Sequence, residues 1–332
     1  MLEQELLVAV RAVRRACWVT QKVQSALVSA DTLEKKDKSP VTVADFASQA
    51  VVCRALAEHF PLDPVVGEEG ADDLRGDEAA ELREAVRVVV GQSLRQDDVN
   101  EAAVLSWIDR GAFDPAQAEE KERKRYWTLD PIDGTKGFLR KEHYAVALAL
   151  IEDGEVVLGV LGCPKMQVGR KQGAIFTAVR GRGAQALLID SEELEGEPIT
   201  VASRQEVEKA RFCESVESGH SSHDDAAKIA EKLGITKEPY RIDSQCKYAA
   251  IGKGSASIYL RLPTKKGYEE KIWDHAAGVI VVEEAGGVVT DVKGEKLDFS
   301  IGRTLRDNTG VVATNGKFHD EVIEAVRAVL GV

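Results

Sequence analysis

The amino-acid sequence predicts an α/β fold of stacked helix and sheet layers, on three observations. Apolar residues recur at helical spacing through residues 2–29. The pattern becomes β-like between Tyr126 and Val160, and in the second half short apolar strands alternate with helical segments. Helical stripes repeat every 3.6 residues, whereas the side chains of a strand alternate with a period of two. Each change of period therefore marks a new layer of the fold.

The first 125 residues are predicted to be mostly helical. Residues 2–29 read as one long amphipathic helix, which the charged run at 35–40 breaks. A second helix is expected from about Phe46 to Phe60. Residues 70–125 are acidic and helical in composition, and their last seven residues, a mixed-charge run, are predicted to be a solvated connection.

Strands are predicted from residue 126 onward. Residues 126–129 form a buried strand, and Asp153-Gly154 between two apolar runs is a strong hairpin signal. The resulting meander is expected to end at the loop 181–183. Later strands are predicted at 199–202, 210–214, 240–242, 257–260 and 310–313. A composition shift at 190–197 predicts a boundary between an α+β domain of residues 1–190 and an α/β domain of residues 191–332.

Composition limits the partners of the chain. Its 332 residues are 44% hydrophobic and carry a net charge of −12, which disfavours nonspecific binding to nucleic acid or to an anionic membrane. Acidic residues stand near the N-terminus, where a targeting peptide would be basic or free of acids, so we expect a cytoplasmic protein. The five cysteines are odd in number and widely spaced, which favours buried thiols over disulfides or zinc ligands.

A metal site is predicted directly behind the strand at 126–129. Pro131 and Gly134 favour a tight turn, around which Asp130, the carbonyl of Ile132 and Asp133 can converge. Magnesium prefers such oxygen ligands and commonly shares them with substrate phosphate. An isolated Asp-x-x-Asp pair is more often a solvated turn, so this motif needs support from elsewhere in the chain.

Two further acidic segments give that support. Glu68 and Glu69 follow a short apolar run, and Asp274 opens the apolar stretch 276–285. Asp274 can also cap a helix, and Glu69 is either a partner of a metal-bound water or a solvated neighbour. Because an acidic site repels an anionic substrate, metal is expected to be needed for binding as well as for chemistry.

With these segments the chain resembles the lithium-sensitive, magnesium-dependent phosphatases that include inositol monophosphatase, and within them the 3'(2'),5'-bisphosphate nucleotidases. The broader resemblance rests on Val-Gly-Glu-Glu at 66–69, Asp-Pro-Ile-Asp-Gly-Thr at 130–135 and Trp-Asp-His-Ala-Ala-Gly at 273–278. The narrower one rests on Lys-Gly-Phe-Leu-Arg at 136–140, Lys-Ser-Pro-Val-Thr-Val-Ala-Asp at 38–45, Gly-His-Ser-Ser-His-Asp at 219–224, Asp-Ser-Gln-Cys-Lys-Tyr at 243–248 and Tyr-Leu-Arg-Leu-Pro at 259–263.

The resemblance implies a layered α-β-α-β-α fold and a hydrolytic site. The implied ligands of two or three Mg²⁺ ions are Glu68, Asp130, the carbonyl of Ile132, Asp133 and Asp274. Asp45 and Thr135 are implied to orient and deprotonate the attacking water. From local sequence alone, Asp45 reads better as the N-cap of a helix that begins at Phe46.

The implied reaction removes the 3'-phosphate of 3'-phosphoadenosine 5'-phosphate (PAP) to give AMP, with its sulfated precursor (PAPS) as a second substrate. The implied contacts with the nucleotide are Thr135, His220, Ser244, Lys247 and Arg261, most of them in the C-terminal domain. Sensitivity to lithium and a monomeric state are expected. The alternatives are an inositol polyphosphate 1-phosphatase and a non-catalytic nucleotide or redox sensor.

Two stretches depart from the pattern of the family. Residues 111–124 are acidic where relatives carry a glycine-rich turn, and 165–173 is a short connection where others carry longer loops. Neither stretch holds an implied ligand. They bear on substrate preference and on access to the site.

Overall fold

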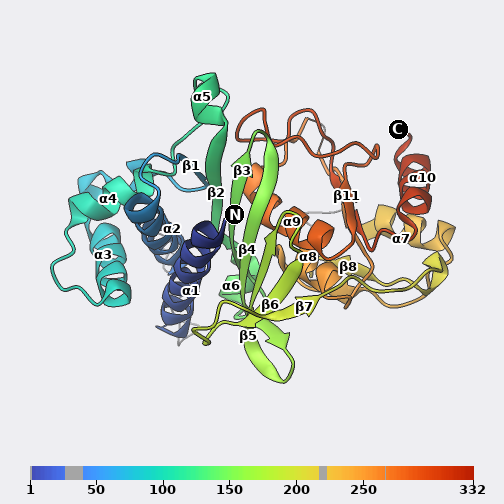
Figure 1. Ribbon diagram of the computed structural model, residues 1–332, viewed down its shortest axis with the longest axis horizontal. Coiled ribbons are helices and arrows are strands. Elements are labelled where there is room, and N and C mark those ends of the chain that lie inside the picture. The colour runs from blue at the N-terminus through green and yellow to red at the C-terminus, as the bar shows by residue number, and fades with distance from the viewer. Residues whose placement is uncertain (1, 27–39, 217–222, 266) are drawn as a thin grey trace.

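The computed structural model describes residues 2–26, 40–216, 223–265 and 267–332, which form two β-sheets and three groups of helices. In Figure 1, α1 to α4 cover one face of the first sheet, α8 and α9 lie between the two sheets, and α7 and α10 lie outside the second. This order confirms the layered α-β-α-β-α arrangement that the family resemblance implies.

The N-terminal helices agree with the sequence in kind but differ at their boundaries. Their bounds are α1 (Glu3–Ala26), α2 (Pro40–His59), α3 (Ala80–Leu94), α4 (Glu101–Asp109) and α5 (Glu120–Arg123), with 3-10 turns η2 (Ala71–Leu74) and η3 (Asp77–Ala79) before α3. The last residues of the first predicted helix, 27–29, lie outside the described residues. Helix α2 begins at Pro40, not near Phe46, because the fixed φ of proline suits the first helical position.

This earlier start changes the position of Asp45. The residue lies in the second turn of α2, with only 8% of its surface exposed. The prediction that Asp45 caps a helix beginning at Phe46 is therefore wrong.

Seven strands form the first sheet in sequence order. They are β1 (Val65–Gly67), β2 (Arg125–Asp133), β3 (Ala145–Glu152), β4 (Glu155–Val168), β5 (Lys171–Val179), β6 (Ala184–Leu188) and β7 (Glu197–Ile199). Only the β1–β2 pair is parallel. The predicted hairpin is confirmed, with Asp153 and Gly154 at φ values of 48° and 79° in its turn.

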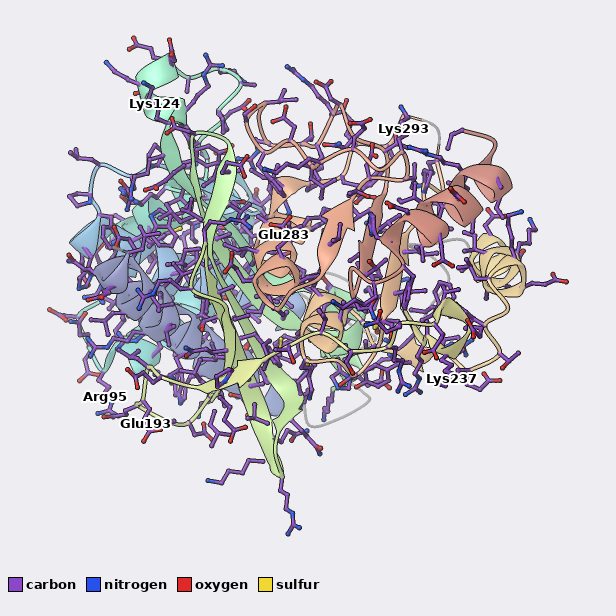
Figure 2. The ribbon with its side chains drawn as sticks, turned by 45° about the vertical axis from the view of Figure 1, so that its right-hand side comes forward. Arg95, Lys124, Glu193, Lys237, Glu283 and Lys293 are labelled. Atoms are coloured by element: carbon purple, nitrogen blue, oxygen red, sulfur yellow. The ribbon has the colours of Figure 1, made fainter. Side chains whose placement is uncertain are left out.

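The structure corrects one expectation about this region and refines two others. The loop 181–183 does not end the meander, because its two glycines turn the chain back and β6 and β7 follow. The segment 165–173 is the end of the β4–β5 hairpin, which extends beyond the body of the molecule (Figure 1, Figure 2). The run 119–125 is only partly a solvated connection, since Arg125 begins β2 and pairs with Glu5, Asp63 and Glu152.

The second sheet has the order β11-β12-β10-β8-β9. Its strands are β8 (Phe212–Glu214), β9 (Tyr240–Arg241), β10 (Ile258–Arg261), β11 (Val288–Thr290) and β12 (Val311–Thr314). The remaining helices are α6 (Thr135–Leu139), α7 (His223–Lys232), α8 (Cys246–Gly252), α9 (Ala276–Glu284) and α10 (His319–Leu330), with 3-10 turns η4 (Val207–Lys209) and η6 (Ile272–Asp274). Strand β11 was not predicted. Because β7 joins the first sheet, that sheet continues past residue 190. The predicted domain boundary stays a prediction.

Helix α9 joins the two sheets. Residues 276–282 are buried on every side, as expected of a helix that is apolar all round. The helix packs closely on β4 at Gly159, where an added Cβ would lie 2.4 Å from Ile280 Cγ2 and 2.9 Å from the carbonyl oxygen of Ala277. It packs on α8 at Gly278, where a Cβ would meet the ring of Tyr248. The two glycines set the distance between the layers.

The cysteines are all buried and unpaired, which agrees with the prediction that they are packing residues rather than disulfides. Burial raises the pKa of Cys53 and Cys213 to about 12, so these thiols stay protonated at neutral pH. Among the helices of the described residues, none is long and apolar enough to cross a membrane.

We expect Gly159→Ala to destabilise the protein by about 1–3 kcal/mol, because the new methyl group would push α9 away from β4. The free energy of unfolding in urea measures this. Gly70→Ala is the matched control, since an added Cβ there has no atom within 4 Å and the φ of Gly70 is −121°. Equal stability of the two variants would contradict the close packing of α9 on the first sheet.

Candidate active site

A cavity of about 440 Å³ lies where the end of β2, α6, the start of α8, the end of β10 and η6 meet. Its size is typical of small-ligand sites. One wall is acidic and carries Glu68, Asp130, Asp133 and Asp274. The lining also includes the cations Lys136, Arg140, Lys247 and Arg261, of which Arg140 pairs with Asp243 and Arg261 with Glu270. We call these two sets of side chains the acidic wall and the basic wall. A cavity lined by both sets can bind an anionic ligand through its cations.

The acidic wall follows from the pairing of β1 and β2. These strands run parallel, with Gly67 opposite Leu129, so Glu68, the residue after β1, lies beside Asp130 in β2. The amide of Glu68 also donates to the carbonyl of Leu129 at 3.2 Å. The two predicted acidic segments therefore meet because their strands are neighbours.

A bulge in β2 exposes the third predicted ligand. Strand β2 continues through Pro131, but its register with β3 shifts between Asp130 and Asp133. Ser48 in α2 donates to the carbonyl of Pro131 at 3.0 Å, and Asp130 accepts from the amide of Ile132 at 3.0 Å. An interrupted ladder is what allows a strand residue such as Ile132 to turn its carbonyl toward a ligand.

Asp274 reaches this wall from a distant part of the sequence, in η6. The expectation that it caps a helix is not met: the N-cap of α9 is His275, and no side-chain hydrogen bond caps that helix. Asp274 is half-buried and faces the cavity.

Crowding of the acids shifts their pKa values upward. Burial and the charges of Glu68, Asp133 and Asp274 raise the pKa of Asp130 well above its usual range. Burial and the charge of Asp274 raise the pKa of Asp133 to about 6, although Lys247 opposes this. Water screens the charge of the exposed Glu68 more than that of the buried Asp130. Acids this close are costly to ionise together without a cation.

This donor set fits a divalent cation of the magnesium type. It offers several carboxylates and a strand carbonyl, all oxygen donors, at one end of an open cavity. Among the described residues, the ligand atoms of Glu270, Asp274 and His275 also lie within 4.8 Å of one another. Neither Glu270 nor His275 was predicted as a ligand, and both already make hydrogen bonds, which are described below.

Three side chains that the sequence analysis did not single out hold the backbone around the acids. Gln49 in α2 donates to the carbonyls of Glu69 (2.6 Å) and Ile108 (3.0 Å) and accepts from the amide of Glu69. Gln245 donates from its backbone amide to Asp133 and from its side chain to the carbonyl of Trp273 at 2.8 Å. Gln49 and Gln245 thereby connect the backbone of the acidic wall to α2 and α8.

The third of these side chains is Arg303. It donates to the carbonyls of Gly67 at 2.6 Å and Phe113 at 2.9 Å, and its guanidinium lies 4.9 Å from the ring centroid of Trp273. Gly67 and Trp273 directly precede Glu68 and Asp274. Arg303 therefore fixes the relative position of two ligand segments that are about two hundred residues apart.

The basic wall contains a buried lysine. Lys247 in α8 is 4% exposed, donates to the hydroxyl of Ser215 at 3.1 Å, and lies 5.2 Å from the ring centroid of Tyr259. Burial lowers the pKa of Lys247, and Asp133 opposes the shift. Burying a cation costs free energy when its hydrogen-bond partner is a neutral hydroxyl. An anionic ligand in the cavity would offset that cost.

Ser244 lines the cavity in a strained conformation. Its φ is 67°, which is uncommon for a residue with a side chain, and its hydroxyl accepts from the amide of Cys246 at 3.2 Å. Gly134, at φ 89°, packs against it, and a Cβ there would lie 2.9 Å from Ser244 Cβ. Glycine is required here both for the left-handed backbone and for the close approach.

The structure brings most of the other predicted residues to this site. Thr135 begins α6, and both Thr135 and Arg261 line the cavity. Asp45 and Glu69 are not among the lining residues. Burial and the nearby charges of Glu69 and Glu68 raise the pKa of Asp45. His220 lies outside the described residues.

The chain was compared with known proteins. The profile described as "Inositol monophosphatase family" matches residues 1–330. A protein of Schizosaccharomyces pombe named 3'(2'),5'-bisphosphate nucleotidase is 43% identical, covering 98% of this chain and 96% of its own. A protein of Emericella nidulans with the same name is 43% identical and covers 99% of each chain.

Solved structures support the fold. The inositol monophosphatase of Anabaena superposes with a TM-score of 0.61 at 21% identity, covering 98% of this chain and 96% of its own. CysQ of Bacteroides thetaiotaomicron, a bacterial member of the inositol monophosphatase family, superposes with a TM-score of 0.62 at 21% identity, covering 95% and 98%.

We expect Asp130→Asn to stabilise the metal-free protein at pH 8, because the asparagine carries no charge to repel Glu68, Asp133 and Asp274. Because the pKa of Asp130 is raised on folding, its ionisation lowers stability as pH rises above about 4, and the asparagine variant lacks this loss. Urea unfolding with chelator at pH 5 and pH 8 measures the difference. Asp225→Asn on α7 is the surface control, and parallel pH profiles for wild type and Asp130→Asn would contradict the crowding.

Proposed function

The chain belongs to the inositol monophosphatase family, and from this premise we propose that it is a phosphatase that hydrolyses the 3'-phosphate of PAP to give AMP, with PAPS as a second substrate. The names of the relatives from S. pombe and E. nidulans support this choice. We further propose that the protein acts as a cytoplasmic monomer on this small-molecule nucleotide.

The observation that carries the proposal is that acidic and basic side chains line the same cavity. A nucleoside bisphosphate has two phosphates, one to be cleaved at the acidic wall and one to be held by the cations of the basic wall. An inositol monophosphate has no second phosphate for Lys247 and Arg261. The buried position of Lys247 favours a substrate that brings a second anion.

The residues proposed to hold two or three Mg²⁺ ions are Glu68, Asp130, Asp133 and Asp274, together with the carbonyl of Ile132. Bound magnesium would supply positive charge for the cleaved phosphate and lower the pKa of a water molecule. Four of these five lie in residues 1–190, the proposed metal-binding domain. Asp274 comes from the second domain, 191–332, which supplies most of the nucleotide contacts.

The other residues are proposed to bind and orient the reactants. Thr135 directs a water toward the phosphorus, and its hydroxyl passes a proton toward the carboxylate of Asp45. Ser244 donates a neutral hydrogen bond to the nucleotide, while Lys247 and Arg261 hold the 5'-phosphate. His220 is proposed as a further contact by the family resemblance alone.

We expect magnesium-dependent phosphate release from PAP to exceed release from inositol 1,4-bisphosphate and from inositol 1-phosphate. The assay compares the three substrates with and without Mg²⁺. Preference for inositol 1,4-bisphosphate would favour an inositol polyphosphate 1-phosphatase, for which Lys247 and Arg261 would bind the second phosphate of the inositol. Preference for the monophosphate would contradict our assignment of the basic wall.

The Asp133→Asn variant controls this assay, because it removes one carboxylate from the acidic wall. An enzyme should lose more than about a hundredfold in rate. A non-catalytic sensor would give a different result. Its wild type would show no turnover, and the Asp133→Asn variant would keep nucleotide binding and any biological function.

We expect lithium at millimolar concentration to inhibit phosphate release at fixed Mg²⁺. Lithium is a small cation that suits the same oxygen donors but carries half the charge, so it would not offset the repulsion among the acids in the same way. Activity measured against lithium, with potassium chloride at equal ionic strength as the control, tests this. A rate indifferent to lithium would contradict the proposed use of the acidic wall.

A further inference from the structure

We propose that Glu270 is the positioning residue for the second phosphate of the substrate, holding the guanidinium of Arg261 through a buried network that continues to His275 and Tyr248. This inference rests on the proposed function, since it assigns Arg261 to the phosphate that is not cleaved. It adds a specificity residue outside the set that the sequence analysis predicted.

The network joins three elements around the cavity. Arg261 at the end of β10 donates from Nε to Glu270 Oε1 at 3.1 Å. The other carboxylate oxygen, Oε2, lies 3.2 Å from His275 Nε2. His275 Nδ1 in turn lies 2.7 Å from the hydroxyl of Tyr248 in α8. Glu270, His275 and Tyr248 are 6%, 1% and 1% exposed, so bulk water does not compete for these bonds.

The hydrogen bonds of the network keep Glu270 ionised. Burial raises the pKa of Tyr248 well above its usual range, so its phenol keeps its proton. The phenol is hydrogen-bonded to His275 Nδ1, and His275 Nε2 faces Glu270 Oε2. Burial alone would raise the pKa of Glu270, but the hydrogen bond and electrostatic effect of His275 and the charge of Arg261 lower it to about 2. Glu270 is therefore a carboxylate that uses both oxygens.

This bonding decides between two roles for the trio of Glu270, Asp274 and His275. Both oxygens of Glu270 and both nitrogens of His275 are engaged within the protein, which leaves Asp274 to face the acidic wall. The trio is therefore better explained as a support than as a separate cation site. Its position supports that reading, because His275 follows Asp274 and Tyr248 follows Lys247 in the sequence.

The charge of Glu270 by itself works against binding an anion. It lies directly beside Arg261 and cancels part of the positive charge that a phosphate would meet. If Glu270 acted only through its field, its neutralisation would strengthen binding of the second phosphate. If it acts by fixing the plane of the guanidinium, neutralisation would weaken binding, because a glutamine keeps only one acceptor oxygen and holds the arginine less firmly before the ligand binds. The two roles predict opposite signs.

The test compares the wild type with Glu270→Gln on two substrates that share the cleaved ester. PAP has a 5'-phosphate, and adenosine 3'-phosphate lacks it. We expect the variant to raise KM for PAP about tenfold, with kcat within about twofold and kcat/KM for adenosine 3'-phosphate unchanged. Binding of AMP, measured by calorimetry, should weaken by the same factor. An unchanged or lower KM for PAP, or an equal loss on both substrates, would overturn the proposal.

Two further variants keep the result interpretable. Glu152→Gln removes a carboxylate from Arg125, far from the cavity, and should change neither substrate. Tyr248→Phe removes only the hydroxyl at the end of the network, and we expect a rise of about threefold in KM for PAP. If Glu270→Gln fails to fold, the absence of that rise in Tyr248→Phe overturns the proposal.

Failure of the proposed function is distinguishable from failure of this inference. A wild type that does not release phosphate from PAP contradicts the function. The calorimetric comparison with AMP still tests Glu270, because it needs no turnover. If the wild type hydrolyses PAP and the Glu270→Gln variant has the same kinetics on both substrates, only the inference is contradicted.

Discussion

Repulsion among carboxylates at one edge of the first sheet is the constraint on which the rest of the site depends. Asp130 is held almost out of contact with water, beside Glu68, Asp133 and Asp274. Isolated buried acids would gain protons or move apart. Here Gln49, Gln245 and Arg303 bind the backbone next to them, so the acids stay together. Hydrogen bonds and packing elsewhere in the fold thus hold several negative charges close together.

The layer between the sheets connects that charge to the basic wall. Helices α8 and α9 pack tightly through Gly278 and Tyr248, and α9 packs on the first sheet at Gly159. Lys247 lies in α8, and Asp274 lies just before α9. A shift of either helix would therefore move a group of one wall relative to the other. The packing of these two helices therefore positions one group of each wall.

The sequence predicted the parts of the site that follow regular patterns. Glu68 and Asp130 each stand beside an apolar strand, and the glycine after Asp133 marked the turn, so their meeting could be expected. The N-terminal boundary of α2 and the short strands β7 and β11 could not, because three-residue strands and helix ends carry little periodicity. The supporting residues were equally hidden. Gln49 and Arg303 bond to backbone carbonyls, which every residue possesses, so no local pattern identifies their partners. Glu270 stood close to Asp274 in sequence, but its link to Arg261 exists only in the folded chain.

Arg303 has a consequence for how the protein matures on the ribosome. The segments around Glu68 and Asp130 emerge early, whereas the arginine that binds the carbonyl of Gly67 emerges near the end of synthesis. The nascent chain must therefore carry its acidic strand ends without this brace until residue 303 has been translated. Contacts of such long sequence separation form late and slowly. The competent site is consequently a product of complete translation, and a chain truncated before residue 303 would keep the carboxylates of both halves without the arginine that aligns them.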